Sequence, residues 1–157
     1  MNLIHIDFLE FIKTGKFDCI KIGQTKEYIL ENFPKPDSIW DNYHTSSNIW
    51  TYGNIEFHFS KNELYMMFSD HFNYQKLNAG KHISIDRWIF ERPRRLTLKN
   101  VIQELNTHHI DFQKTTTKLN IELKLNSGVI LYFENHKDIT DLDPNKFHLV
   151  AFAFKEK

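Results

Sequence analysis

Hydrophobic residues recur along the first half of the chain at spacings typical of amphipathic helices. Ile6–Ile12 is apolar at positions 6, 8, 9, 11 and 12, which indicates a segment with one buried face. Ile20–Gly23 reads as a short extended segment that leads into a second helix. Thr25 is a favourable N-cap for that helix, and Pro34 ends it. The apolar face of this second helix consists of Ile29, Leu30 and Phe33.

Apolar residues then alternate with polar ones, which is the period of a half-buried strand. Ile55–Phe59 alternates at every position, and turn residues such as Gly53-Asn54 separate it from its neighbours. The predicted strands of this half are Asp37–Tyr43, Ile49–Tyr52, Ile55–Phe59 and Leu64–Phe68. They predict an antiparallel meander behind a pair of helices.

The second half repeats this order of patterns. Asp86–Phe90 takes the place of Ile6–Ile12, and Thr97 takes the place of the capping Thr25. The helical face after Thr97 consists of Leu98, Val101, Ile102 and Leu105. The strands that follow are expected at Ile110–Lys114, Leu119–Leu125, Val129–Phe133 and Phe147–Phe154.

The repeated order predicts an α+β fold made of two tandem helix–helix–antiparallel β-meander units. The first unit spans 1–78 and the second spans 79–157, packed as one compact body. The meanders either form separate sheets or join into one curved sheet. A period of about 70 residues is too long for a solenoid repeat and fits a duplicated small domain. The halves differ too much in sequence to exclude two unrelated α+β units.

Composition narrows the class of protein. Twenty basic and 20 acidic residues give a formal net charge of zero, unlike a protein that coats nucleic acid. The charge is uneven, because residues 1–78 carry 10 acids and 7 lysines (−3) and residues 79–157 carry 10 acids and 13 bases (+3). The single cysteine, Cys19, fits a reducing compartment. Met1–Asp7 lacks a signal-peptide pattern, so we expect a cytoplasmic protein.

Residues 20–70 resemble a known family. The pattern Gly23-x-Thr25-x-x-x-Ile29-x-x-x-Phe33-Pro34-x-Pro36 resembles the helix–sheet module of the SmpA/OmlA group, which also builds the β-lactamase inhibitor protein, with Pro34 in place of the second glycine. The run Trp50-x-Tyr52-Gly53-x-Ile55-Glu56-Phe57-x-Phe59 is similar to small bacterial proteins that include immunity proteins encoded beside contact-dependent toxins. Outer-membrane members carry a lipoprotein signal that is not found here. The resemblance therefore implies a cytosolic toxin inhibitor.

Sequence motifs for catalysis or cofactor binding are absent. The chain has no glycine-rich phosphate loop, no nucleophile elbow and no zinc-protease motif. Adjacent His108 and His109 would point about 100° apart on a helix, which does not suit one metal ion. The acidic loop containing Asp138, Asp141 and Asp143 lacks the glycine and the terminal glutamate of a calcium loop. We therefore expect no cofactor, no bound metal and no enzymatic activity.

All four arginines fall in Arg87–Arg95, which we call the arginine segment. Guanidinium groups bind carboxylates or phosphates in two-pronged fashion and stack on aromatic rings. Because Trp and Arg are common at interface hot spots, the segment is a candidate binding surface. Its candidate partner-binding residues are Trp88, Arg92, Arg94 and Arg95. The alternative is a helix–helix junction with Trp88 and Phe90 in the core and the arginines in water.

The second candidate surface is Asp37–His44, which we call the acidic–aromatic segment. Its candidate partner-binding residues are Asp37, Trp40, Asp41 and Tyr43. Such a surface suits a protein that fills a basic cleft. The alternative places Trp40 in the sheet core and the loop in solvent.

Together these observations predict a cytoplasmic immunity protein that binds a cognate toxin domain 1:1 and covers its active site or an adjacent surface. No direct contact with nucleic acid or a membrane is expected. The alternative is a non-catalytic regulatory or small-molecule-binding module that uses the concave sheet. An enzyme of unfamiliar type is a third possibility.

Overall fold

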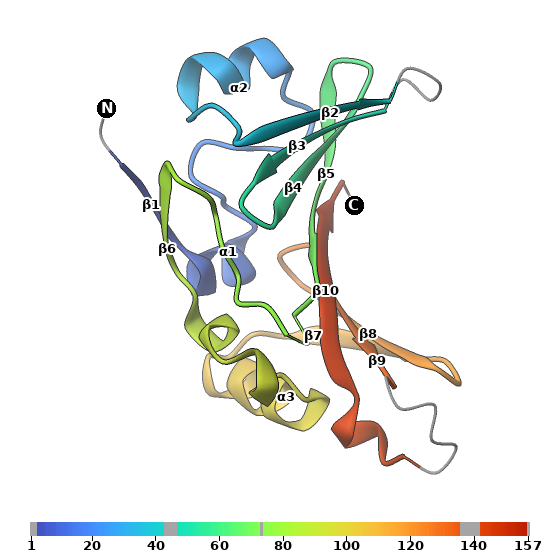
Figure 1. Cartoon of the computed structure of the whole chain (residues 1–157). Helices are drawn as coiled ribbons and strands as arrows, with labels where there is room; N and C mark the ends of the chain where they lie inside the picture. The colour runs from blue at the N-terminus through green and yellow to red at the C-terminus, as the bar shows by residue number, and fades with distance from the viewer. Residues whose placement is uncertain (1–2, 43–46, 73, 136–141, 157) are drawn as a thin grey trace.

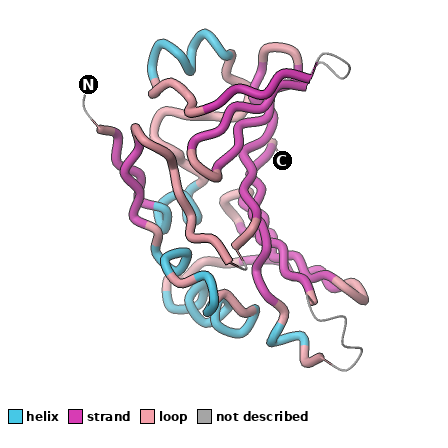
Figure 2. Tube along the Cα trace, viewed as in Figure 1, coloured by secondary structure: helices cyan, strands magenta, loops and turns pink. Residues whose placement is uncertain are grey.

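The computed structural model describes residues 3–42, 47–72, 74–135 and 142–156. In this part of the chain, three α-helices accompany a large antiparallel sheet of eight strands and a small parallel sheet of two strands (Figure 1). The expected α+β class is confirmed. Figure 2 shows the strands of the large sheet running as a continuous layer beside the helices.

Each α-helix begins at a side chain that caps its first turn. The helices are α1 (Phe8–Thr14), α2 (Lys26–Asn32) and α3 (Leu98–Thr107). The Thr25 hydroxyl accepts a hydrogen bond from the Tyr28 N–H, and the Thr97 hydroxyl accepts one from the Asn100 N–H. Both predicted caps are therefore confirmed, and each satisfies an N–H that the helix itself leaves unpaired.

The large sheet contains two four-stranded meanders. Its strand order is β2-β3-β4-β5-β10-β9-β8-β7. The strands are β2 (Ser38–Asn42), β3 (Ser47–Tyr52), β4 (Ile55–Ser60), β5 (Glu63–Asp70), β7 (Phe112–Thr116), β8 (Asn120–Leu125), β9 (Val129–Glu134) and β10 (His148–Lys155). All eight lie within a few residues of their predicted positions, because each is a short alternating or apolar run bounded by turn residues.

The two meanders join at the centre of the sheet. β5 and β10 pair antiparallel, with Asp70 opposite Ala151 and Met66 opposite Lys155. Of the two arrangements left open by the sequence, the single sheet is the one adopted.

Equivalent backbone hydrogen bonds tie the residue before each capping threonine to the start of the fourth strand of its meander. In the first half the Leu64 N–H donates to the Gln24 carbonyl over 2.9 Å. In the second half the Leu149 N–H donates to the Leu96 carbonyl over 2.7 Å. Thr25 bridges Glu63 in the same way that Thr97 bridges His148. Duplication of the two halves remains a prediction.

The segments that precede the capped helices differ from the predicted helix pairs. Ile4–Asp7 forms β1, which pairs parallel with β6 (Ile83–Asp86), and α1 starts only at Phe8 because Asp7 caps it. Of the predicted extended segment Ile20–Gly23, Ile20 forms an isolated bridge with Phe17, whereas Ile22 and Gly23 lie in a turn.

The predicted counterpart of the first helix, Asp86–Phe90, is also wrong. β6 ends at Asp86, and only a 3₁₀ turn, η1 (Trp88–Glu91), follows. Arg92 precedes Pro93, and a residue before proline is sterically held out of the helical region, so the turn cannot lengthen into a helix. A second turn, η2 (Pro93–Arg95), leads to Thr97.

Aromatic rings fill the space between the sheet and the helices. Phe152 on β10 is fully buried, and its ring lies 5.3 Å from that of Phe8, 6.0 Å from Phe72 and 6.4 Å from Phe90. These rings come from α1, from the segment after β5 and from η1. Phe152 therefore links the sheet to both halves of the covering layer.

Replacement of Phe152 by Ala should lower the free energy of unfolding by about 3–5 kcal/mol, because the cavity would remove contacts to several elements at once. Urea denaturation followed by circular dichroism measures this. Leu119→Ala, at a side chain that is 60% exposed, is the control and should stay within about 0.5 kcal/mol of wild type. Equal losses for the two variants would show that Phe152 is not central to the core.

Tyr52→Phe should lower the free energy of unfolding by about 1–2 kcal/mol at neutral pH, because the buried Tyr52 hydroxyl donates to the Pro34 carbonyl over 2.9 Å. Burial, aided by the charge of Asp37, raises the pKa of Tyr52 well above its usual value. The neutral hydroxyl therefore stabilises the fold below pH of about 10, and this contribution is lost as the pH rises further. Urea titrations between pH 7 and 11 should show a steeper loss for wild type than for Tyr52→Phe, and identical slopes would contradict the assignment.

Candidate functional site

The arginine segment follows an irregular path that its sequence explains. Phe90, inside the segment, and Leu96, directly after it, are buried in the core and hold the segment against it. η1 begins at Trp88, whose φ of +51° lies in the left-handed region that few non-glycine residues adopt. The Asp86 carboxylate accepts a hydrogen bond from the Trp88 N–H over 3.2 Å and supports this turn.

Arg87 anchors the first half of the segment. Its Nε donates to the Leu77 carbonyl, and its terminal nitrogen pairs with the Glu91 carboxylate at 3.3 Å. Glu91 also accepts from the Lys76 ammonium over 2.7 Å, and this bond, with the nearby positive charges, lowers the pKa of Glu91. Arg87 is thus a structural residue that fixes the turn.

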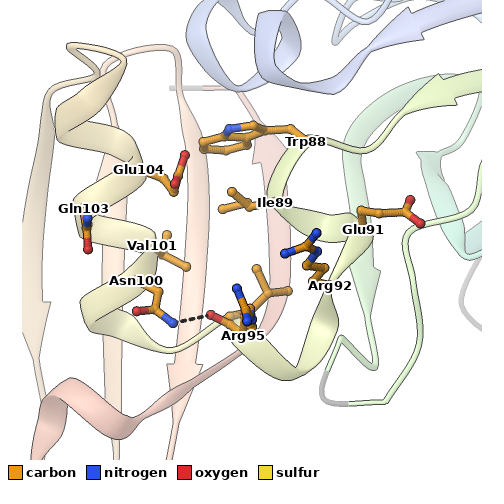
Figure 3. A pocket seen from close by; sticks show the side chains of 10 residues that line it. Trp88, Ile89, Glu91, Arg92, Arg95, Asn100, Val101, Gln103 and Glu104 are labelled. Carbon is orange, nitrogen blue, oxygen red and sulfur yellow. Dashed lines mark hydrogen bonds between the residues drawn. The ribbon is translucent and has the colours of Figure 1, made fainter.

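The second half of the segment is held through its backbone carbonyls. The Asn100 side-chain amide on α3 donates to the Arg95 carbonyl over 2.9 Å (Figure 3). The His148 Nε2 at the start of β10 lies 2.7 Å from the Pro93 carbonyl oxygen. The backbone that carries the remaining arginines is therefore fixed from two sides.

A pocket of about 530 Å³ opens between the arginine segment and α3. Figure 3 shows the side chains of both elements around it. It is lined by Trp88, Ile89, Glu91, Arg92, Arg95, Leu96, Asn100, Val101, Gln103 and Glu104. Its volume is in the range of pockets that enclose small ligands or single side chains of a partner.

Three predicted partner-binding residues, Trp88, Arg92 and Arg95, line this one pocket. Arg92 and Arg95 are exposed, and neither guanidinium forms an ion pair or hydrogen bond with any residue that the structure describes. Trp88 is half-buried, in contact with the His108 ring at 5.7 Å, and its indole nitrogen finds no hydrogen-bond partner in the same part of the chain. Two carboxylates also line the pocket, and of these Glu91 pairs with Lys76 and Arg87. The unpaired guanidinium groups beside apolar side chains suit a carboxylate attached to an apolar body.

The fourth residue predicted in this segment, Arg94, is exposed but is not part of the pocket lining. Polar residues of the opposite wall, namely Asn100, Gln103 and Glu104, were not predicted. They lie on the polar face of α3, which the sequence pattern identifies only as the face turned to solvent.

The acidic–aromatic segment is divided between structural and exposed residues. The Asp37 carboxylate accepts hydrogen bonds from the Gly53 N–H over 2.8 Å and from the Lys81 N–H over 3.4 Å, so it has partners within the chain. Trp40 and Asp41 lie on β2 and are exposed. Tyr43 lies outside the described residues, as do Asp138 and Asp141.

The two candidate surfaces lie apart. Figure 1 shows β2 at one end of the molecule and α3 at the other. β2 is also an edge strand of the large sheet, whereas the pocket lies beside the start of β10. Each surface is therefore considered as a separate binding site.

One further cluster was not predicted. His71 Nε2 lies 3.0 Å from the Asp70 carboxylate, and His71 Nδ1 lies 2.8 Å from the Tyr74 hydroxyl. All three side chains are open to water at the edge of a pocket of about 300 Å³. Solvent competes for these hydrogen bonds, so the cluster orients the imidazole without isolating it from water.

Among the described residues, no group of three His, Cys, Asp or Glu side chains is placed to hold a metal ion. In the same part of the chain, no helix is long and apolar enough to cross a lipid bilayer. Asp143 of the predicted acidic loop accepts from the Asn145 N–H over 3.0 Å and caps a short 3₁₀ turn.

Comparison with known proteins yields no matching family model, no matching curated protein and no matching solved structure.

Arg87 anchors the fold, whereas Arg92 and Arg95 are free, and the free energies of unfolding of single variants can test this distinction. Arg87→Ala should lower the free energy of unfolding by about 1.5–3 kcal/mol, because it removes hydrogen bonds made by a charged group. Arg92→Ala and Arg95→Ala should change it by less than about 0.5 kcal/mol. Urea denaturation of the three variants distinguishes these outcomes. A loss at Arg92 or Arg95 as large as that at Arg87 would mean that their guanidinium groups support the fold.

Proposed function

We propose that this protein is a cytoplasmic immunity protein that binds a bacterial toxin domain and covers its active site or an adjacent surface, without catalysing a reaction. The toxin assignment is supported by the resemblance of residues 20–70 to modules found in inhibitors and immunity proteins. The binding role is supported by the geometry of the arginine segment.

The observation that carries the proposal is the pocket lined by Trp88, Arg92 and Arg95. Hydrogen bonds from Asn100 and His148 already hold the backbone beneath these arginines. A partner therefore needs to order only the guanidinium groups, which reduces the entropic cost of binding. Free guanidinium groups beside a tryptophan form the kind of centre that dominates many protein interfaces.

The expected ligand at this pocket is an acidic side chain or loop of the toxin. A carboxylate can accept two parallel hydrogen bonds from one guanidinium. An apolar neighbour in the same loop would contact Ile89 and Val101 on the pocket floor. A pocket of this size receives one or two side chains, so the surrounding surface must supply the rest of a standard 1:1 interface of about 1,600 Å².

The two halves of the chain are, in this proposal, tandem copies of one helix–sheet unit. Support comes from the matching hydrogen bonds at Gln24–Leu64 and Leu96–Leu149 and from the equal strand order of the two meanders. Duplication would explain how a small binding module acquires a long sheet.

A second candidate is a non-catalytic regulatory or small-molecule-binding module that uses the sheet face opposite the core. One observation favours it: Ile130, Ala151 and Ala153 are buried although they lie outside the main core cluster. The pocket near Phe68 and Tyr74 lies beside this apolar patch.

The immunity proposal predicts that cells producing this protein survive the toxin encoded beside its gene. Growth of toxin-producing cells with and without the protein measures this. A lack of protection by the folded wild-type protein would reject the toxin assignment.

The pocket is tested by the affinity of that toxin for single variants whose folding has been checked. Arg92→Ala and Arg95→Ala should each cost about 2 kcal/mol, roughly a 30-fold loss of affinity, mainly through faster dissociation. Arg94→Ala, outside the pocket, is the matched control and should cost under about 1 kcal/mol, fading with salt. The affinity of the toxin for Asp41→Ala tests whether β2 belongs to the interface. Wild-type affinity for both pocket variants would exclude this pocket from the interface.

A further inference from the structure

The large sheet ends in two edge strands, β2 and β7. An edge strand has a row of backbone N–H and C=O groups that no neighbouring strand satisfies. Natural proteins usually protect such edges with charged side chains, prolines or covering segments. The two edges of this sheet differ in how far they follow that rule.

On the core face, Ile39 of β2 is the outer end of an apolar row that crosses the sheet. Ile39 lies opposite Trp50, which lies opposite Phe57, which lies opposite Met67. The three inner residues are 3%, 0% and 1% exposed, whereas Ile39 is 55% exposed. The core therefore continues to the edge and stops at an uncovered side chain.

The opposite face of β2 shows the same feature. Trp40 lies opposite Ile49, in a row that continues to His58 and Met66. Trp40 is 65% exposed. β2 thus presents large apolar side chains on both faces, and the only charge within Ser38–Asn42 is Asp41.

The other edge is protected. On β7, Phe112 is half-buried against the core, and the following positions Gln113, Lys114 and Thr115 are polar or charged and exposed. Lys114 ends the core-face row that runs through the buried Leu123. Polar and charged side chains of this kind are the usual protection of a sheet edge. β2 differs because two successive large apolar side chains, Ile39 and Trp40, are exposed on it.

We infer that β2 is a docking edge for an extended strand of a different protein, which adds to the sheet by main-chain hydrogen bonds. Alternate side chains of that strand would cover Ile39 on one face and Trp40 on the other. Asp41 shares the face of Ile39, so the docked strand should carry a basic residue opposite Asp41. The inference concerns the binding mode of β2 and does not depend on the toxin assignment.

A second copy of this chain fits the edge less well than a basic strand does. Antiparallel pairing with Ile39 opposite Ile39 places Asp41 opposite the second copy's Asp37. Pairing with Trp40 opposite Trp40 places the Asp41 carboxylate against Ile39, and pairing with Asp41 opposite Asp41 opposes two like charges. Like charges directly opposite each other destabilise a strand pair, and a carboxylate beside a covered isoleucine is poorly solvated.

The probe for this inference is a synthetic peptide of alternating Val and Thr with one Lys placed to face Asp41. Titration into the full chain, followed by amide NMR and hydrogen exchange, should give saturable 1:1 binding that slows exchange in Ser38–Asp41. A peptide of the same composition with a central proline should not bind, since proline removes a main-chain donor. Ile39→Lys should weaken binding at least tenfold, and Thr115→Lys on β7 should leave it unchanged.

A charge exchange makes the test specific. Asp41→Lys should weaken binding of the Lys peptide, and a Glu peptide should bind Asp41→Lys more tightly than it binds wild type. Circular dichroism checks that each variant is folded. Absence of saturable binding to wild type, slowed exchange at β7 in place of β2, or a wild-type dimer that Ile39→Lys dissociates would each overturn the inference. Peptide binding with no protection from the toxin would leave β2 docking supported and the immunity proposal rejected.

Discussion

The antiparallel pairing of β5 with β10 is the interaction on which the rest of the structure depends. Each strand is the fourth of its meander, so this single pairing converts two small sheets into one. It places Phe152 opposite Ser69, whose buried hydroxyl donates to the Asn54 carbonyl. From that position Phe152 contacts Phe8 of α1 and Phe90 of η1. These ring contacts determine where α1 and η1 pack on the sheet.

The arginine pocket is a consequence of the same pairing. η1 is fixed because Phe90 packs edge-on against Phe8 and Phe72 beside Phe152. η2 is fixed because His148, the first residue of β10, contacts the Pro93 carbonyl. Free cationic side chains therefore stand on a backbone that is attached to the centre of the sheet, although they lie at the surface. The stability of the sheet and the placement of these side chains therefore depend on the same strand.

Local patterns determined which parts of this architecture could be predicted. Thr25 and Thr97 cap helices through bonds to residues three positions away, and each meander strand is an alternating or continuous apolar run bounded by turn residues, so local sequence was sufficient for both. β1 and β6 were not predicted, because each alternates over only four residues and their parallel pairing joins Ile4 to Ile83, far away in the sequence. The pocket was predicted on one wall only, since its α3 wall consists of ordinary surface residues. The internal partners of Asp37, at Gly53 and Lys81, likewise depend on the tertiary fold.

The position of β10 in the chain has a consequence for the order of events during synthesis. β5 is complete at Asp70, but its partner spans His148–Lys155, so the first meander leaves the ribosome with an unpaired inner strand. Contacts between residues so distant in sequence are slow to form, because the intervening loop must close first. The native sheet therefore forms late in folding. Until β10 pairs with β5, the side chains of Phe68 and Met66 remain accessible to chaperones and to neighbouring chains.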